Sequence, residues 1–167
     1  VRFGEGSLKS DPNITALVIE DKNIREAFRP IGIANRLDQT SAKIREGMRI
    51  TFHLIKEMDI ACKKEGCRLL IVIIPTKETV FSDYLENNPR LHLHETLDRL
   101  IANERSARHT LIEFLTDAGI AYMDTLPKLK QSVGDQLYAQ TTRDMHPGKN
   151  GYRIIGEAVA DYLRTRQ

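Results

Sequence analysis

Six consecutive apolar residues at positions 69–74, Leu-Leu-Ile-Val-Ile-Ile, constrain the fold more than any other feature of the sequence. The run lies between Gly66 and Pro75, so it is too short for a helix, and most of its residues are β-branched. An apolar strand without alternating polar residues is typical of parallel sheets, whose strands are buried on both faces. The sequence therefore predicts an α/β chain built around a parallel sheet.

Amphipathic segments flank this strand. From Ser41 to Gly66, apolar residues recur every three or four positions, which predicts a helix with one buried face. Ser41 is a suitable N-cap for that helix and Gly66 a suitable stop. The further expected elements are a helix over 95–118, a strand over 120–124, a short helix around 128–133 and a closing helix over 150–164.

The first forty residues are the least regular part of the chain. The apolar run Ile14–Ile19 predicts a strand, whereas residues 22–40, which include Pro30 and Gly32, are expected to form a loop. Residues 41–167 alternate helix and strand, which predicts a three-layer α/β sandwich with a short parallel sheet. Because no linker or repeat divides residues 1–167, we expect a single α/β domain or the C-terminal part of one.

Charge and hydropathy exclude several classes of protein. The 25 basic and 23 acidic residues give a net charge of +2, so no overall field attracts nucleic acid. No apolar run approaches the roughly 20 residues of a membrane helix, and we expect a soluble chain without a membrane segment. Cys62 and Cys67 fit neither a redox nor a zinc motif; their spacing leaves a disulfide open, and with it the cellular compartment.

Polar residues at the carboxyl ends of the expected strands are the first place to look for a site. Thr76, Lys77 and Glu78 follow the 69–74 strand and are expected to line a cleft at that edge of the sheet. A solvated charged turn is the alternative for the same three residues.

A second polar segment precedes the closing helix and reads Asp144-Met145-His146-Pro147. Gly151 follows shortly after it and is expected to let the closing helix start close to the sheet. An imidazole has an unperturbed pKa of about 6.5, so it can take a proton from a nucleophile near neutral pH. A carboxylate nearby fixes the tautomer of that imidazole and stabilises its charged form. The alternative is that Asp144 only supports the loop and His146 is a surface imidazole.

The segment from Asp144 through Gly151 and Tyr152 into the closing helix resembles the C-terminal block of SGNH/GDSL hydrolases. The Asp-x-His spacing, and the segment Pro75–Glu78, are similar to the branch related to alginate O-acetyltransferases. The resemblance covers the chain from Ser41 to its end, roughly the later half of such a domain. It implies an SGNH/flavodoxin-like fold and a serine esterase or O-acyltransferase that acts on acyl, often acetyl, esters of small molecules or carbohydrates.

In that family the histidine is the base and the aspartate orients it, roles that the resemblance gives to His146 and Asp144. It implies no cofactor and no metal, and it slightly favours an extracytoplasmic location. The Gly-Asp-Ser segment of the family is not recognisable: Ser7 lacks a preceding apolar strand, and Asn13 and Asn23 match an oxyanion donor by residue type only. We therefore expect a domain incomplete at its N-terminus and inactive by itself.

Other readings stay open, so whether the chain is part of an enzyme is undecided. A missing serine also fits a non-catalytic module that binds a carbohydrate or a protein. His92 and His94, with Asp144 or His146, fit a metal site by residue type. A short sheet would leave an edge open to a second copy of the chain, so we consider a homo-oligomer through that edge.

Overall fold

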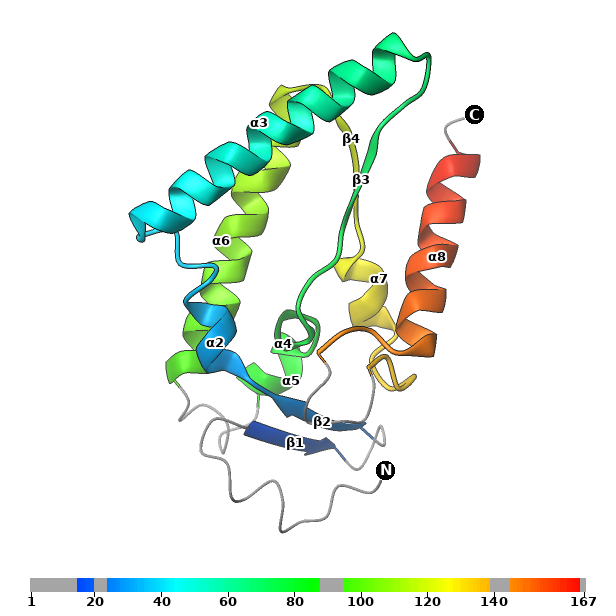
Figure 1. Ribbon diagram of the computed structural model, residues 1–167. Helices are drawn as coiled ribbons and strands as arrows, with labels where there is room; N and C mark the ends of the chain where they lie inside the picture. The colour runs from blue at the N-terminus through cyan, green and yellow to red at the C-terminus, as the bar shows by residue number, and fades with distance from the viewer. Residues whose placement is uncertain (1–14, 20–23, 88–94, 139–144, 166–167) are drawn as a thin grey trace.

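The computed structural model describes residues 15–19, 24–87, 95–138 and 145–165, and within them the chain is mixed α/β (Figure 1). In chain order the elements are β1 (Thr15–Ile19), β2 (Ile24–Phe28), α2 (Pro30–Ala34), α3 (Ala42–Lys64), β3 (Leu70–Ile73), α4 (Lys77–Val80), α5 (Ser82–Glu86), α6 (Glu95–Asp117), β4 (Ala121–Asp124), α7 (Leu126–Gln131) and α8 (Lys149–Arg164). The long expected helices and both expected strands of the parallel sheet are confirmed; the short helix begins two residues before its expected place.

Strands β3 and β4 form a parallel pair joined through α6, and the register runs from Leu70 opposite Ala121 to Ile73 opposite Asp124. Just beyond the pair, the backbone N–H and the hydroxyl of Thr125 both donate to the Ile73 carbonyl, at 3.1 and 2.8 Å. These two bonds hold the carboxyl ends of the strands together, where α4 and α7 begin.

Glycines end the two long helices, as the sequence predicts for the first of them. Gly66 follows α3 with φ of +70° and Gly119 follows α6 with φ of +64°, a backbone region that glycine enters without steric cost. After each glycine the next N–H returns to a carbonyl of the last turn, from Cys67 to Cys62 and from Ile120 to Leu115, both at 2.9 Å. Each helix therefore turns back at once into the strand that follows it.

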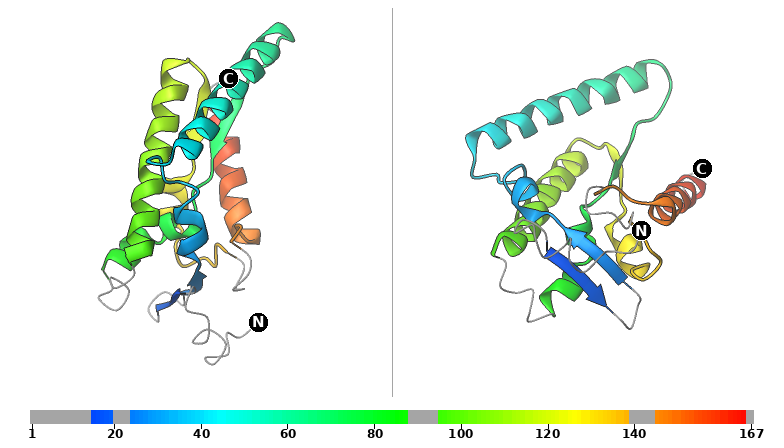
Figure 2. Two further views of the ribbon diagram at one scale, coloured as in Figure 1. Left: turned by 60° about the vertical axis from the view of Figure 1, so that its left-hand side comes forward. Right: turned by 60° about the horizontal axis from the view of Figure 1, so that its bottom comes forward.

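Helices lie on both sides of the β3–β4 pair. In Figures 1 and 2, α3 and α6 lie on one side of the two strands and α8 lies on the other. Strands β1 and β2 pair antiparallel with each other and form a separate small sheet. Among the described residues the parallel sheet thus has two strands.

Burial around the parallel sheet is lower than the sequence predicts. Residues 70–72 of β3 are half-buried and Ile74 is 47% exposed, so the prediction of a strand buried on both faces is wrong for this structure. Helix α3 contains no buried residue, although the sequence predicts one buried face for it, and its Met58 is 51% exposed. The cause is the small number of described elements around them: α3 packs on one side only, against α6 and β3, through contacts such as the stacked rings of Phe52 and Phe114.

The expected loop over residues 22–40 is also wrong, because it contains β2 and α2. In β2 the residues alternate only at its start, and the charged Glu26 is buried among apolar neighbours. Pro30 stands at the first position of α2, where its missing N–H breaks no helical hydrogen bond. The strand expected at 14–19 is confirmed as β1, but it pairs with β2 and takes no part in the parallel sheet.

The main core lies at the carboxyl end of the parallel strands, among β2 and the helices α2, α4, α5, α6, α7 and α8. Its fully buried members are large side chains such as Phe28, Phe81, Leu100, Leu129 and Leu137. A smaller cluster under α3 is formed by Ile73, Leu115 and Ile120. The larger core therefore supports the end of the molecule where the polar segments of the sequence meet.

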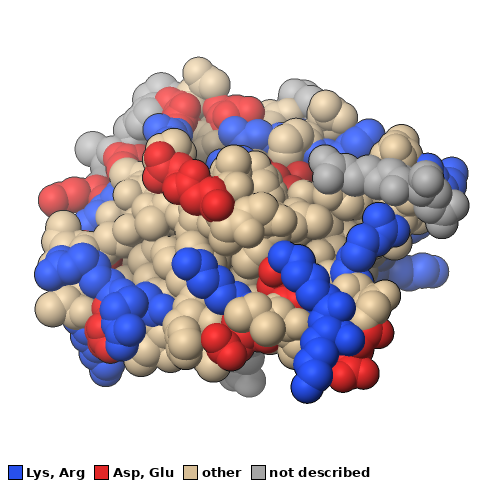
Figure 3. All heavy atoms as spheres, turned by 90° about the horizontal axis from the view of Figure 1, so that it is seen from above, with Lys and Arg blue, Asp and Glu red and all other residues tan. Residues whose placement is uncertain are grey.

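The surface carries both signs of charge. Figure 3 shows Lys and Arg side chains interspersed with Asp and Glu on the face seen from above Figure 1, which agrees with the net charge of +2. No helix formed by the described residues is both long and apolar enough to cross a membrane. Cys62 and Cys67 are free thiols at the opposite end of β3 from the main core.

Candidate functional site

The turn that follows β3 is buried rather than solvated. Thr76 is the N-cap of α4, and its hydroxyl accepts a hydrogen bond from the Thr79 N–H at 3.4 Å. In the first turn of α4, Lys77 is 1% exposed and Glu78 is fully buried. The alternative of a solvated charged turn is therefore wrong. The ionisable side chains of Lys77 and Glu78 lie inside the protein.

Glu104 of α6 holds this turn in place. Its carboxylate accepts from the Thr76 N–H at 2.8 Å, from the Thr76 hydroxyl by a very short bond, and from the Thr79 hydroxyl at 2.7 Å. Glu104 is 7% exposed, so these bonds replace most of its hydration. They tie the carboxyl end of β3 to the middle of α6.

Lys77 is held by a carboxylate and by two aromatic rings. Its Nζ lies 3.4 Å from Oε2 of Glu26 in β2, 5.6 Å from the ring centre of Phe28 and 6.0 Å from that of Tyr138. A cation over the face of an aromatic ring is stabilised by the ring quadrupole, most strongly where water is excluded. Ion pair and rings together make the burial of this ammonium group tolerable.

The buried carboxyl group of Glu78 is only partly satisfied by hydrogen bonds. Its Oε1 accepts from the Arg29 N–H at 3.2 Å, while its Oε2 is buried without a hydrogen-bond partner among the described residues. Burial raises the pKa of Glu78, although backbone hydrogen bonds and the Lys77 charge partly offset the effect. Burial likewise raises the pKa of Glu26, with Lys77 opposing it.

Tyr138 closes the cluster from the segment that follows α7. Its side chain is 2% exposed, and its ring lies 6.0 Å from that of Phe81. Burial, followed by the nearby carboxyls of Glu78, Glu26 and Glu104, raises the pKa of its hydroxyl. The phenol therefore stays protonated in the folded protein, and its oxygen has no hydrogen-bond partner among the described residues.

The turn that carries His146 is fastened to the backbone of residues 137–138. Tyr138 and Pro147 form an antiparallel bridge, and the Gly148 N–H donates to the Leu137 carbonyl at 2.7 Å. A Cβ on Gly151 would overlap that same carbonyl oxygen and lie 2.8 Å from Cβ of Pro147. The close approach expected at Gly151 is therefore present, but it is made to this segment instead of to the strands of the sheet.

His146 itself is exposed on this turn, whereas Asp144 lies outside the described residues. In Figure 1 the segment leading into α8 runs beside α4, on the side of the molecule where β3 and β4 end. The structure therefore brings the β3–α4 turn and the His146 turn to the same end of the sheet, with Tyr138 between them. An exposed imidazole there can exchange protons with a bound molecule.

Sequence reasoning missed Glu26, Glu104 and Tyr138. A signal existed for Glu104, because it occupies the position four residues after Leu100 on the apolar stripe of its helix, where a charge needs a buried partner. Glu26 and Tyr138 stand in short segments without a clear period, so nothing in their spacing indicates burial.

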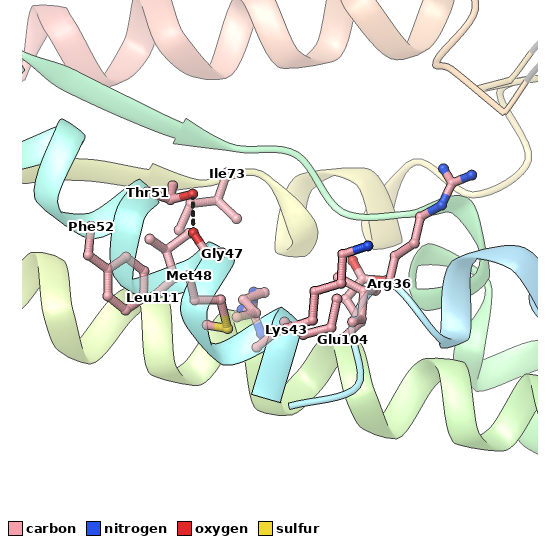
Figure 4. Close-up of a pocket in the computed structure, with 13 residues that line it drawn as sticks. Arg36, Lys43, Gly47, Met48, Thr51, Phe52, Ile73, Glu104 and Leu111 are labelled. Atoms are coloured by element: carbon pink, nitrogen blue, oxygen red, sulfur yellow. Dashed lines mark hydrogen bonds between the residues drawn. The ribbon is translucent and has the colours of Figure 1, made fainter. Parts of the chain in front are cut away.

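A cavity of about 550 Å³ lies between α3 and α6, beside the end of β3 (Figure 4). Phe52 and Leu111 lie at one end of it and Arg36 at the other, and most of its wall is apolar. Glu104 also lines this cavity, but Thr76, Lys77 and Glu78 do not, so their expected place in a cleft stays a prediction.

The described serines do not stand where a family nucleophile would. Ser41 precedes α3, Ser82 begins α5, Ser106 lies within α6 and Ser132 follows α7, so none follows a strand directly. The residues Ser7, Ser10, Asn13 and Asn23 lie outside the described residues, as do His92 and His94. Among the residues that the structure describes, no three His, Cys, Asp or Glu side chains form a group able to hold a metal ion.

Comparisons with known proteins add no assignment: no family model, no curated protein and no solved structure matches the chain. The function of the chain is therefore inferred from its geometry and its sequence motif.

Proposed function

We propose that the chain is the C-terminal part of an SGNH-type serine esterase or O-acyltransferase that acts on acyl esters of a small molecule or carbohydrate. In this proposal His146 is the general base, Asp144 orients it, and the nucleophilic serine with its oxyanion donors lies upstream of Ser41. The β3–β4 pair, flanked by helices, then belongs to a three-layer sandwich with a short parallel sheet. The observation that carries the proposal is the exposed His146 on a turn that is fastened to Tyr138, whose ring lies near Lys77 in the helical turn after β3.

The chemistry follows from the residue types. The imidazole of His146 takes the proton of the serine hydroxyl as the serine oxygen attacks the ester carbonyl, and the carboxylate of Asp144 stabilises the imidazolium that results. The imidazolium then returns the proton to the departing alcohol, which leaves an acyl-serine. Water releases the acyl group in an esterase, and a hydroxyl of the acceptor takes it in an O-acyltransferase.

Steady-state kinetics of the full gene product on a simple acetyl ester test the proposal. We expect His146→Ala to lower kcat by roughly 10⁴-fold or more, as loss of a triad histidine does, and Asp144→Asn to lower it strongly as well. His109, exposed on α6 and paired with Glu113, provides the matched control, and His109→Ala should leave kcat unchanged. If His146→Ala keeps the wild-type turnover, His146 is not the general base.

A non-catalytic module that binds a carbohydrate or a protein is the second candidate. It is favoured by the positions of the described serines, none of which directly follows a strand. Full gene product that binds an acetylated oligosaccharide but shows no turnover, and no loss of binding in His146→Ala, would support this module over the enzyme.

A further inference from the structure

We propose that Lys77 and Tyr138 are positioning residues, which hold the turn carrying His146 in place from inside the protein. This inference rests on the proposed function for its significance, because that function makes the place of His146 matter. It concerns two buried side chains that have no expected role in the reaction.

The first step is that Lys77 is fixed. Its side chain is 1% exposed, its Nζ is paired with Glu26 at 3.4 Å, and the ring of Phe28 faces it at 5.6 Å. The helical turn on which it stands is tied to α6 through Glu104. An ammonium group that is held in this way has a fixed position, so it can fix the position of a neighbouring aromatic ring.

The second step is that Lys77 fixes the position of the Tyr138 ring. Its Nζ lies 6.0 Å from the centre of the Tyr138 ring, which Phe81 contacts as well. The Tyr138 hydroxyl has no hydrogen-bond partner among the described residues, so contacts of its ring, rather than a bond from its oxygen, hold the side chain. The place of the 137–138 backbone thus depends on packing against a cation and an aromatic ring.

The third step is that residues 137–138 fix the position of the turn that carries His146. Tyr138 bridges Pro147, the residue next to His146, and Leu137 accepts from Gly148 at 2.7 Å. Asn150 adds a bond from its side-chain amide to the Asp135 carbonyl at 2.6 Å. A shift of the Tyr138 ring is therefore passed through two backbone contacts to the residues on the C-terminal side of His146.

Amide hydrogen exchange and NMR spectra of the 167-residue chain test this inference. The readout is the exchange rate of the Gly148 amide, divided by that of Leu129, whose N–H bonds to Thr125 at 3.0 Å in α7. A general loss of stability raises both rates and leaves the ratio unchanged, whereas a loosened turn raises the ratio. The side-chain resonances of His146, assigned through His146→Gln, report its surroundings.

The main variant is the double substitution Lys77→Met with Glu26→Gln. Removing both partners avoids leaving one buried charge without the other, so the protein should fold. We expect the ratio of the Gly148 exchange rate to that of Leu129 to rise by about threefold to thirtyfold, the range between an exposed and a desolvated cation–π contact, and the His146 resonances to shift. Lys64→Met, at the exposed end of α3, is the control and should change neither.

A second pair of variants tests the ring itself. Tyr138→Phe keeps the ring and should match the wild-type ratio and His146 spectrum, whereas Tyr138→Leu should raise the ratio. Folded double and Tyr138→Leu variants with wild-type ratios and unchanged His146 resonances would overturn the inference. Neither readout uses ester turnover, so these results stand apart from the kinetic test: active His146→Ala would remove the proposed function and leave the positioning result intact.

Discussion

At the scale of single residues, the buried carboxyls around Lys77 decide how the protein responds to pH. Glu26, Glu78 and Glu104 are each at least nine-tenths buried, and the Nζ of Lys77 lies 3.4 Å from the carboxylate of Glu26. Glu104 is satisfied by three donors, whereas one oxygen of Glu78 has no hydrogen-bond partner among the described residues. Glu78 is therefore the residue whose charge costs most.

Glu78→Gln should stabilise the protein increasingly as the pH rises. The pKa of Glu78 is raised from 4.5 in the folded state, so below about that pH both states hold the proton and the charge costs nothing. Above it the unfolded chain ionises first, and the free energy of unfolding of the wild type falls. The neutral amide keeps the bond from the Arg29 N–H and escapes this loss.

Urea denaturation from pH 4 to pH 8 measures the effect. The stability difference between Glu78→Gln and wild type should grow with pH, while Glu57→Gln, on the exposed face of α3, should show no such growth. A difference that is the same at every pH would show that the charge of Glu78 carries no cost.

Gly151→Ala should destabilise the protein by about 1–3 kcal/mol, because its methyl group would overlap the Leu137 carbonyl oxygen and crowd Pro147. Gly156, later in the same helix, has no atom within 4 Å of an added Cβ, so Gly156→Ala should be neutral or stabilise by up to about 1 kcal/mol. Thermal unfolding of both variants checks the pair. Equal changes in stability in the two variants would contradict a close contact at Gly151.

The two halves of the candidate site differ in how far the sequence predicts them. His146 and Gly151 stand in a motif whose spacing is visible in the sequence, and Gly151 makes the expected close approach with a different partner. Lys77 and Glu78 are buried because their partners lie far away in the sequence: Glu26, which pairs with Lys77, is 51 positions away, and Arg29, whose N–H donates to Glu78, is 49 positions away. Local pattern carries no information about such long-range pairs.

At the scale of elements, Glu104 joins α6 to the β3–α4 turn. Glu104→Ala would leave the Thr76 N–H and the hydroxyls of Thr76 and Thr79 without their acceptor inside the protein. We expect a loss of roughly 1.5–3 kcal/mol, the range for hydrogen bonds to a charged group. Chemical denaturation measures it, with the exposed Glu113→Ala as control, expected within about 0.5 kcal/mol of wild type. A neutral Glu104→Ala would mean that the turn is held by packing alone.

The long elements follow from sequence periodicity, and the short ones do not. Helices α3, α6 and α8 have repeating apolar positions over 16 to 23 residues, and glycines mark the ends of α3 and α6. Strand β2 and helix α2 have five residues each, and Pro30 is as suitable for a helix start as for a loop. Over five residues no period can be distinguished from chance.

At the scale of the whole molecule, the described residues leave apolar surface around the parallel sheet. Ile50, Leu54 and Met58 of α3 are 45–55% exposed, and β3 has one hydrogen-bonded neighbour among the described strands. The apolar run at 69–74 predicts a strand with more neighbours than this. The mixed α/β class is confirmed, while the three-layer sandwich stays part of the proposal.

Covalent labelling of the full gene product with a fluorophosphonate tests the central claim most directly, because this reagent reacts with a serine that a neighbouring base activates. We predict that one serine is labelled, that His146→Ala abolishes the labelling in a folded protein, and that His109→Ala leaves it unchanged. Labelling of the same serine at the wild-type rate in His146→Ala would contradict the account.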